Sequence, residues 1–262
     1  AQSSEVAGSL RNLFGLDPLV SGILMAIIVA VVIIGGVQRI GQFTSHLVPV
    51  MSVFYVLAGI AMIVLRITEI PGVFAAIFKS AFSFKAVGGG ALGYGIMVAM
   101  RQGFARGVFS NEAGLGTAPI AHAATSTEEP CEQAMWGIFE VFITTFLICT
   151  ITALAILLSG VMDVPGGLDA FPSKGAAAAA AFNAILPGTI GGTIIQVSLL
   201  FFALSTAIGW SYYGETCWSY LFHGNKVVIL IFKLTFAAVC ILGAVGSGTL
   251  MWDISDTLNG LM

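Results

Sequence analysis

Five apolar runs with almost no charge, each about twenty residues or longer, determine what this chain can fold into. They cover residues 19–36, 47–65, 134–161, 193–213 and 227–249. A helix of roughly 20 apolar residues crosses the hydrocarbon core of a bilayer, where the backbone must satisfy its own hydrogen bonds. Charged residues make up 9% of the chain, whereas a soluble domain carries about 25%. The sequence therefore predicts an all-α integral membrane protein that crosses a lipid bilayer several times.

The segments between these runs are expected to be loops and short helices. Residues 1–17 are mixed in polarity and are predicted to hold the end of a helix and a connection. Polar composition predicts loops at residues 38–46, 126–133 and 162–175. Two shorter helices are also expected. One is amphipathic over residues 71–84 and too short to cross the membrane, and the other is alanine-rich over residues 176–186.

Composition and motifs argue against several functional classes. The net charge of −3 is small and scattered, so no nucleic-acid-binding surface is expected. The four cysteines lie far apart, which indicates buried thiols rather than disulfides or a metal site. A G-x-G-x-x-G pattern at residues 88–93 follows no strand, and the chain has no metalloprotease, P-loop or nucleophile-elbow motif. The chain is therefore not expected to be an enzyme.

The most unusual segment is GVFSNEAGLGTAP, residues 107–119, which interrupts a weak apolar span. The apolar pieces on either side, residues 88–105 and 118–125, are each too short to cross a membrane comfortably. Broken helices survive at membrane depth where they are buried in protein or line a wet cavity. Transporters use such breaks as binding sites, because a half-helix N-terminus presents free N–H groups to an anionic ligand.

Individual residues of this segment suit such a break. Gly114 and Gly116 permit unusual backbone angles and a close ligand approach. Thr117 is placed to cap a second half-helix, and Pro119 would lie in its first turn, where a missing N–H does no harm. Glu112 is costly inside a membrane, which by default suggests a functional role.

A simpler interpretation of the segment stays open. Residues 107–119 could be an ordinary loop between two spans, with Glu112 paired to Arg101 or Arg106. His122, one or two turns later, is expected to be a packed or loop-facing side chain. Glu140, in a later apolar run, has no assigned role and is expected to be solvated near one end of its helix.

Residues 101–125, RQGFARGVFSNEAGLGTAPIAHAAT, closely resemble the signature of the alanine/glycine:cation symporter family. The segments at residues 201–222, 251–262 and 1–8 are also similar to the family, so the resemblance covers essentially the whole chain. At the start the family pattern has an Asn where this chain has Ser4, and no role is carried over to that position.

The resemblance implies a LeuT-type inverted-repeat fold whose first and sixth core helices are unwound at mid-membrane. Residues 101–125 would be the sixth core helix. The others would follow the chain: residues 19–36, 47–65, 134–161, 193–213 and 227–249 as the fourth, fifth, seventh, eighth and ninth, with the tenth starting at Trp252. Residues 1–262 would then be a single, incomplete transporter domain. It would run from about the end of the third core helix to the start of the tenth, without the first core helix.

The resemblance also implies sodium-coupled symport of alanine or glycine across the cell membrane by alternating access. The residues expected to bind substrate are Phe109, Ser110, Asn111, Ala113, Gly114, Gly116, Thr117 and Trp252. Ser205 and Thr206 would ligate the coupling Na⁺, a hard cation that prefers oxygen ligands. Their alternative role is a hydrogen bond to a carbonyl of their own helix, and Trp252 could instead be an interfacial tryptophan. Proton coupling and an ion channel are the alternative functions.

Overall fold

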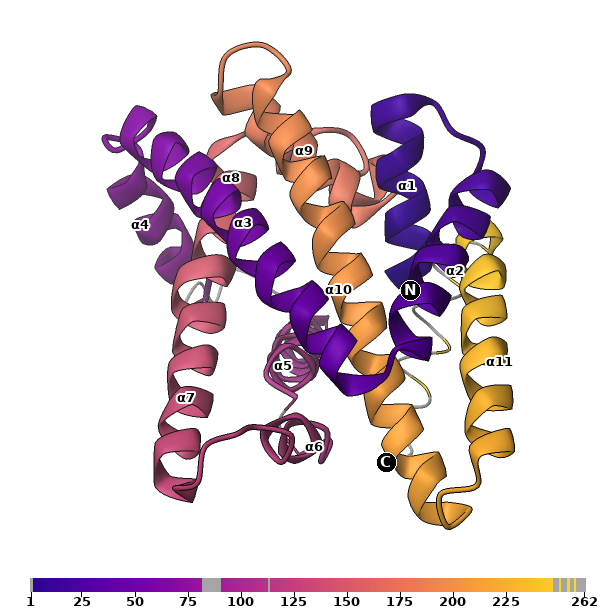
Figure 1. The fold of residues 1–262 in the computed structure, drawn as a ribbon. Coiled ribbons are helices and arrows are strands. Elements are labelled where there is room, and N and C mark those ends of the chain that lie inside the picture. Colours follow the sequence, from indigo (N-terminus) through magenta and orange to yellow (C-terminus); the bar gives the residue numbers. More distant parts are fainter. Residues whose placement is uncertain are drawn as a thin grey trace.

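The structure is a computed structural model that describes residues 2–81, 91–112, 114–246, 250, 254 and 257. Over these residues the regular structure is helical throughout (Figure 1). Four described spans are long and apolar enough to cross a membrane: α3 (Gly36–Leu65), Pro130–Leu158, α10 (Ile190–Leu221) and α11 (Lys226–Val245). A fifth arises if α1 (Gln2–Phe14) and α2 (Pro18–Ile34), bent by 119°, count together. These spans confirm the predicted class of multi-pass α-helical membrane protein.

α10 is the central helix of the molecule. It packs against α1, α2, α3, α9 (Lys174–Ile185) and α11, and it crosses the middle of the bundle in Figure 1. One buried apolar cluster joins α10 to α3, α8 (Cys149–Leu158) and α9, and a second joins it to α1, α2 and α11. Small residues let these helices approach closely, as membrane bundles require. A Cβ added at Gly59 of α3, for example, would clash with Ile151 of α8.

The predicted loop at residues 38–46 is wrong, because these residues belong to α3. Their polar side chains bond back to the helix: Thr44 Oγ1 donates to the Ile40 carbonyl at 2.9 Å, and His46 Nδ1 lies 2.8 Å from the Gln42 carbonyl. Polar residues that satisfy themselves locally do not end a helix. The turn between α2 and α3 comes earlier, at Gly36, whose φ of +76° is a glycine conformation.

The other segments differ less from expectation. The short helices are confirmed as α4 (Ile70–Ala81) and α9, and the N-terminal segment forms α1. The predicted loop at residues 126–133 ends early, because α7 (Pro130–Phe142) begins at a proline, which is tolerated in a first helical turn. The segment at 162–175 contains two short 3₁₀ turns, Val161–Asp163 and Gly167–Ala170, before α9 begins. The span that starts with α7 continues through a π-helix, Ile143–Ile148, into α8 (Cys149–Leu158).

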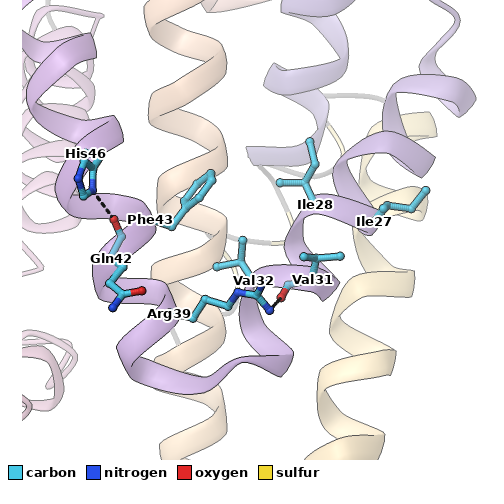
Figure 2. Close-up of a pocket in the computed structure, with 8 residues that line it drawn as sticks. All are labelled: Ile27, Ile28, Val31, Val32, Arg39, Gln42, Phe43 and His46. Atoms are coloured by element: carbon cyan, nitrogen blue, oxygen red, sulfur yellow. Dashed lines mark hydrogen bonds between the residues drawn. The ribbon is translucent and has the colours of Figure 1, made fainter.

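Two cations bind the carbonyl groups at the C-terminal end of α2. Arg39 Nη1 of α3 donates to the Val31 carbonyl at 3.3 Å (Figure 2). Lys233 Nζ of α11 donates to the Ile33 carbonyl at 2.8 Å and lies 2.9 Å from Glu215 Oε1 of α10. The last carbonyls of a helix lack partners within the helix and carry its negative dipole end, so cations stabilise them. Lys233 is buried, and its pairing with Glu215 joins α2, α10 and α11.

Candidate functional site

The predicted break lies between α5 (Ala91–Ser110) and α6 (Ala118–His122). In the described part of this connection, Glu112, Gly114 and Gly116 have φ values of +50°, +80° and +72°. Glycine reaches this left-handed region without strain, whereas Glu112 does so at a cost. The glycines therefore let the chain leave one helix and start another within a few residues.

Two side-chain hydrogen bonds hold the break. Thr145 Oγ1 donates to Asn111 Oδ1 at 3.0 Å, and Thr117 Oγ1 donates to Glu112 Oε2 at 2.6 Å. Thr117 occupies the predicted N-cap position of α6, but its hydroxyl makes no cap hydrogen bond because it donates to the Glu112 carboxylate. The predicted place of Pro119 in that first turn is confirmed.

Several backbone N–H groups of the break donate no hydrogen bond to another described residue. The N–H of Leu115 donates to the Glu112 carbonyl at 3.3 Å. Within the described part of the break, the N–H groups of Gly114, Gly116 and Thr117 donate no hydrogen bond. Successive N–H groups in a turn that alternates between right- and left-handed conformations form a concavity that attracts anions. The segment can therefore accept a carboxylate.

Thr145 is a residue of the break that the sequence analysis missed. It lies in the π-helix between α7 and α8. A π-helix shifts the register of the side chains on a helix and occurs often at functional sites. The sequence signal, two adjacent hydroxyls at Thr144 and Thr145 inside an apolar run, is visible but says nothing about which residue faces the break.

A second missed residue, Tyr213 of α10, lies within electrostatic range of the Glu112 and Glu140 carboxylates. α6 also packs against α10. Glu140 is exposed in the third turn of α7, three residues before the π-helix begins, and not near an end of the Pro130–Leu158 span. The break and α7 thus each place a carboxylate within electrostatic range of the Tyr213 phenol.

The predicted sodium ligands lie on α10. Ser205 Oγ and Thr206 Oγ1 both donate to the Phe202 carbonyl, at 3.0 Å and 2.8 Å. This is the alternative role expected for them. Each hydroxyl oxygen keeps lone pairs that can accept a cation while its hydrogen stays on the carbonyl.

The remaining predicted site residues are divided between α5 and residues without a described structure. Phe109 and Ser110 form the last turn of α5, directly before the break. Ala113 and Trp252 lie outside the described residues.

His122 Nδ1 lies 2.6 Å from Gln133 Nε2, which agrees with the packed side chain expected there. Among the residues that the structure describes, no group of three His, Cys, Asp or Glu side chains could hold a metal ion.

Comparison with known proteins places the chain among membrane transporters. All of residues 1–262 match the sodium:alanine symporter family. The sodium/alanine symporter AgcS of Methanococcus maripaludis is 44% identical over 261 residues, which are 100% of this chain and 55% of that protein. The probable sodium/glutamine symporter GlnT of Bacillus subtilis is 36% identical over 264 residues, 100% of this chain and 52% of that protein.

A third relative is the sodium/proton-dependent alanine carrier protein of Bacillus sp. strain PS3. It is 35% identical over 272 residues, which cover 100% of this chain and 60% of that protein. This chain thus spans about half the length of the curated relatives it matches. The residues that resemble the family signature in the sequence are those that form the break and its flanking helices. The chain therefore belongs to the sodium:alanine symporter family, a family of membrane transporters.

Proposed function

We propose that the complete protein carries a small neutral amino acid, alanine or glycine, across the cell membrane together with Na⁺. The observation that carries the proposal is the break after α5, where the N–H groups of Gly114, Gly116 and Thr117 donate no hydrogen bond within the described residues. An amino-acid carboxylate would sit against these groups, and its ammonium would meet the carbonyls near the end of α5. Names such as sodium/alanine symporter among the relatives support the same substrate and ion.

The proposed mechanism is alternating access in a LeuT-type fold. Substrate would bind at the break, with Na⁺ at Ser205 and Thr206 on α10. α6 packs against α10, so a rearrangement of the break has a direct route to the helix that carries the sodium ligands. Helices that move as rigid bodies around a fixed central site would then expose it to each side of the membrane in turn.

Uptake of labelled alanine into proteoliposomes that hold the full-length protein tests this function. An inward Na⁺ gradient should drive accumulation, and replacing Na⁺ with K⁺ should abolish it. Accumulation that ignores Na⁺ and follows a proton gradient would contradict sodium coupling. Flux that does not saturate with alanine would instead indicate a channel.

The substrate proposal needs its own measurement, because one relative is named for glutamine. Unlabelled glycine should compete with labelled alanine at similar concentrations, whereas glutamine should compete weakly if the pocket is small. Strong inhibition by glutamine would contradict the assignment to small amino acids. Gly114→Leu, at a φ of +80°, should abolish uptake while the protein still reaches the membrane.

A further inference from the structure

A groove lies between the last turns of α2 and the first turns of α3, away from the break. It encloses about 540 Å³, and Ile27, Ile28, Val31 and Val32 of α2 form most of its floor (Figure 2). Ile27 and Val31 are 55% and 51% exposed. Exposed apolar side chains on a helix as apolar as α2 are compatible with contact to lipid acyl chains. The floor is therefore suited to hydrocarbon.

The rim of the groove is polar and comes from one face of α3. Arg39, Gln42 and His46 follow one another at spacings of three and four residues, which places them on the same side of the helix. In Figure 2 Arg39 reaches across to the end of α2, and His46 lies farther along α3. One groove thus combines an apolar floor with a row of hydrogen-bonding groups.

The charge at this rim is positive only. From Pro18 to Leu65, through all of α2 and α3, Arg39 is the one Arg or Lys, and no Asp or Glu occurs. Glu215, which belongs to the cluster at the same end of α2, is paired with Lys233. A guanidinium has five N–H donors in a rigid fork that matches a phosphate, and Arg39 directs one nitrogen at the Val31 carbonyl. The remaining donors can bind an anionic oxygen at the mouth of the groove.

The groove runs back from the turn between α2 and α3, and its lining residues lie at different distances from that turn. The first third of α3 carries Arg39, Gln42 and His46, whereas residues 47–65 carry no charge and form an apolar span. Polar and cationic residues at one end of a membrane helix lie at the headgroup level. Arg39 lies beside Val31 near the turn, whereas Ile27 and Ile28 lie about one helical turn farther along α2.

We propose that this groove binds an anionic phospholipid, with the phosphate at Arg39 and an acyl chain along Ile27, Ile28 and Val31. Basic pockets between membrane helices recognise acidic headgroups, and the Arg39 cation, with no carboxylate in α2 or α3, favours an anionic lipid over a neutral one. The bound lipid bridges α2 and α3 across the Gly36 turn and stabilises the angle between them.

Thermal unfolding of the full-length protein in detergent tests the proposal. Dioleoyl-phosphatidylglycerol should raise the Tm by about 5 °C more than the same amount of dioleoyl-phosphatidylcholine. Arg39→Gln should remove this difference, and Arg39→Lys should keep part of it because a point charge remains. Arg66→Gln is the matched control. Arg66 lies at the other end of α3, paired with Glu69 at 2.5 Å, and its loss should leave the difference intact.

A second variant tests the apolar floor of the groove independently of the Arg39 charge. Ile27→Trp should fill the floor and remove the phosphatidylglycerol effect while Arg39 is unchanged, whereas Ile60→Trp, at a position 48% exposed on α3, should not. Equal Tm values in the two lipids, or a difference that survives Arg39→Gln, would overturn the proposal. An equal rise with inorganic phosphate alone would also overturn it, because the ligand would then be a small anion and not a lipid.

Discussion

The hydroxyl of Thr145, in the π-helix, donates a hydrogen bond of 3.0 Å to Asn111 Oδ1, at the start of the break. The two residues are 34 positions apart in the sequence and come from different helices. Because Oδ1 accepts from Thr145, the amide nitrogen of Asn111 remains a donor for another group. A donor at that place suits the carboxylate of an amino acid.

Thr145→Val should therefore weaken substrate binding. Valine has nearly the shape of threonine and lacks the donor, so Asn111 loses its fixed orientation. We expect KM for alanine uptake to rise about tenfold, which corresponds to roughly 1.4 kcal/mol and the net strength of one hydrogen bond. Thr145→Ser, which keeps the hydroxyl, should have a KM close to that of the native protein.

Thr144→Val is the matched control, because the Thr144 hydroxyl makes no hydrogen bond among the described residues. A tenfold rise in KM for both valine variants would indicate a general effect on the π-helix and would contradict the specific role of Thr145.

Gly116→Ala should reduce uptake because of backbone strain at the break. Gly116 has a φ of +72°, and no heavy atom lies within 4 Å of the place where a Cβ would stand. The cost is therefore conformational, about 1–2 kcal/mol, and not steric. The uptake rate in proteoliposomes measures the loss of transport, and the Tm in detergent measures the loss of stability.

Gly107→Ala provides the comparison for that variant. Gly107 lies inside α5, also has open space at its Cβ position, and has a helical φ. Alanine is favoured over glycine in a helix, so this change should leave stability equal or slightly higher. If Gly107→Ala impaired uptake as strongly as Gly116→Ala, the left-handed conformation would not be the cause.

Lys233→Met should destabilise the protein more than the double change Lys233→Met with Glu215→Gln. The single change leaves the Glu215 carboxylate without its cation and the Ile33 carbonyl without its donor. Breaking a buried pair in this way costs about 3 kcal/mol, whereas neutralising both partners costs less. Tm values of the two variants and of Glu215→Gln complete a double-mutant cycle. Additive effects in the cycle would show that the pair contributes nothing.

Thr206→Val should lower the apparent affinity for Na⁺ while leaving the helix intact. The variant removes an oxygen that now donates to the Phe202 carbonyl at 2.8 Å and that can also accept a cation. Half-maximal uptake should require several times more Na⁺, and Thr206→Ser should behave like the native protein. Thr216→Val is the control, because Thr216 makes the same bond to the Tyr212 carbonyl, at 2.9 Å, farther along α10. If Thr206→Val left the Na⁺ requirement unchanged, the Thr206 hydroxyl would not be a sodium ligand, and its role would be the hydrogen bond to the Phe202 carbonyl.

Local chemistry explains where sequence reasoning about the fold succeeded and where it failed. Gly114 and Gly116 marked the break correctly, because left-handed backbone conformations depend on the residue itself. Residues 38–46 were predicted as a loop from their polarity, but Thr44 and His46 satisfy their polar groups within α3. Polarity indicates contact with water or headgroups, and it does not distinguish a loop from the polar end of a helix.

The partners across helices could not be predicted from the sequence. Thr117 was expected to cap α6, and its hydroxyl instead bonds Glu112, because the left-handed turn brings the two side chains together. Thr145 faces Asn111 from a π-helix, and Lys233 reaches a carbonyl of α2 that is 200 residues away. Such contacts depend on the register and crossing of packed helices, which no local pattern records.

The sequence by itself determined the membrane class, most of the spans, the position of the break and the family. Each depends on composition, on backbone preference or on a contiguous motif, and these properties are local to a segment. Tertiary structure alone decided which side chains hold the break, which cations satisfy the end of α2 and where a groove opens beside Arg39. The physical reason is that each of these features joins groups from different helices, whose relative position is set by packing around α10.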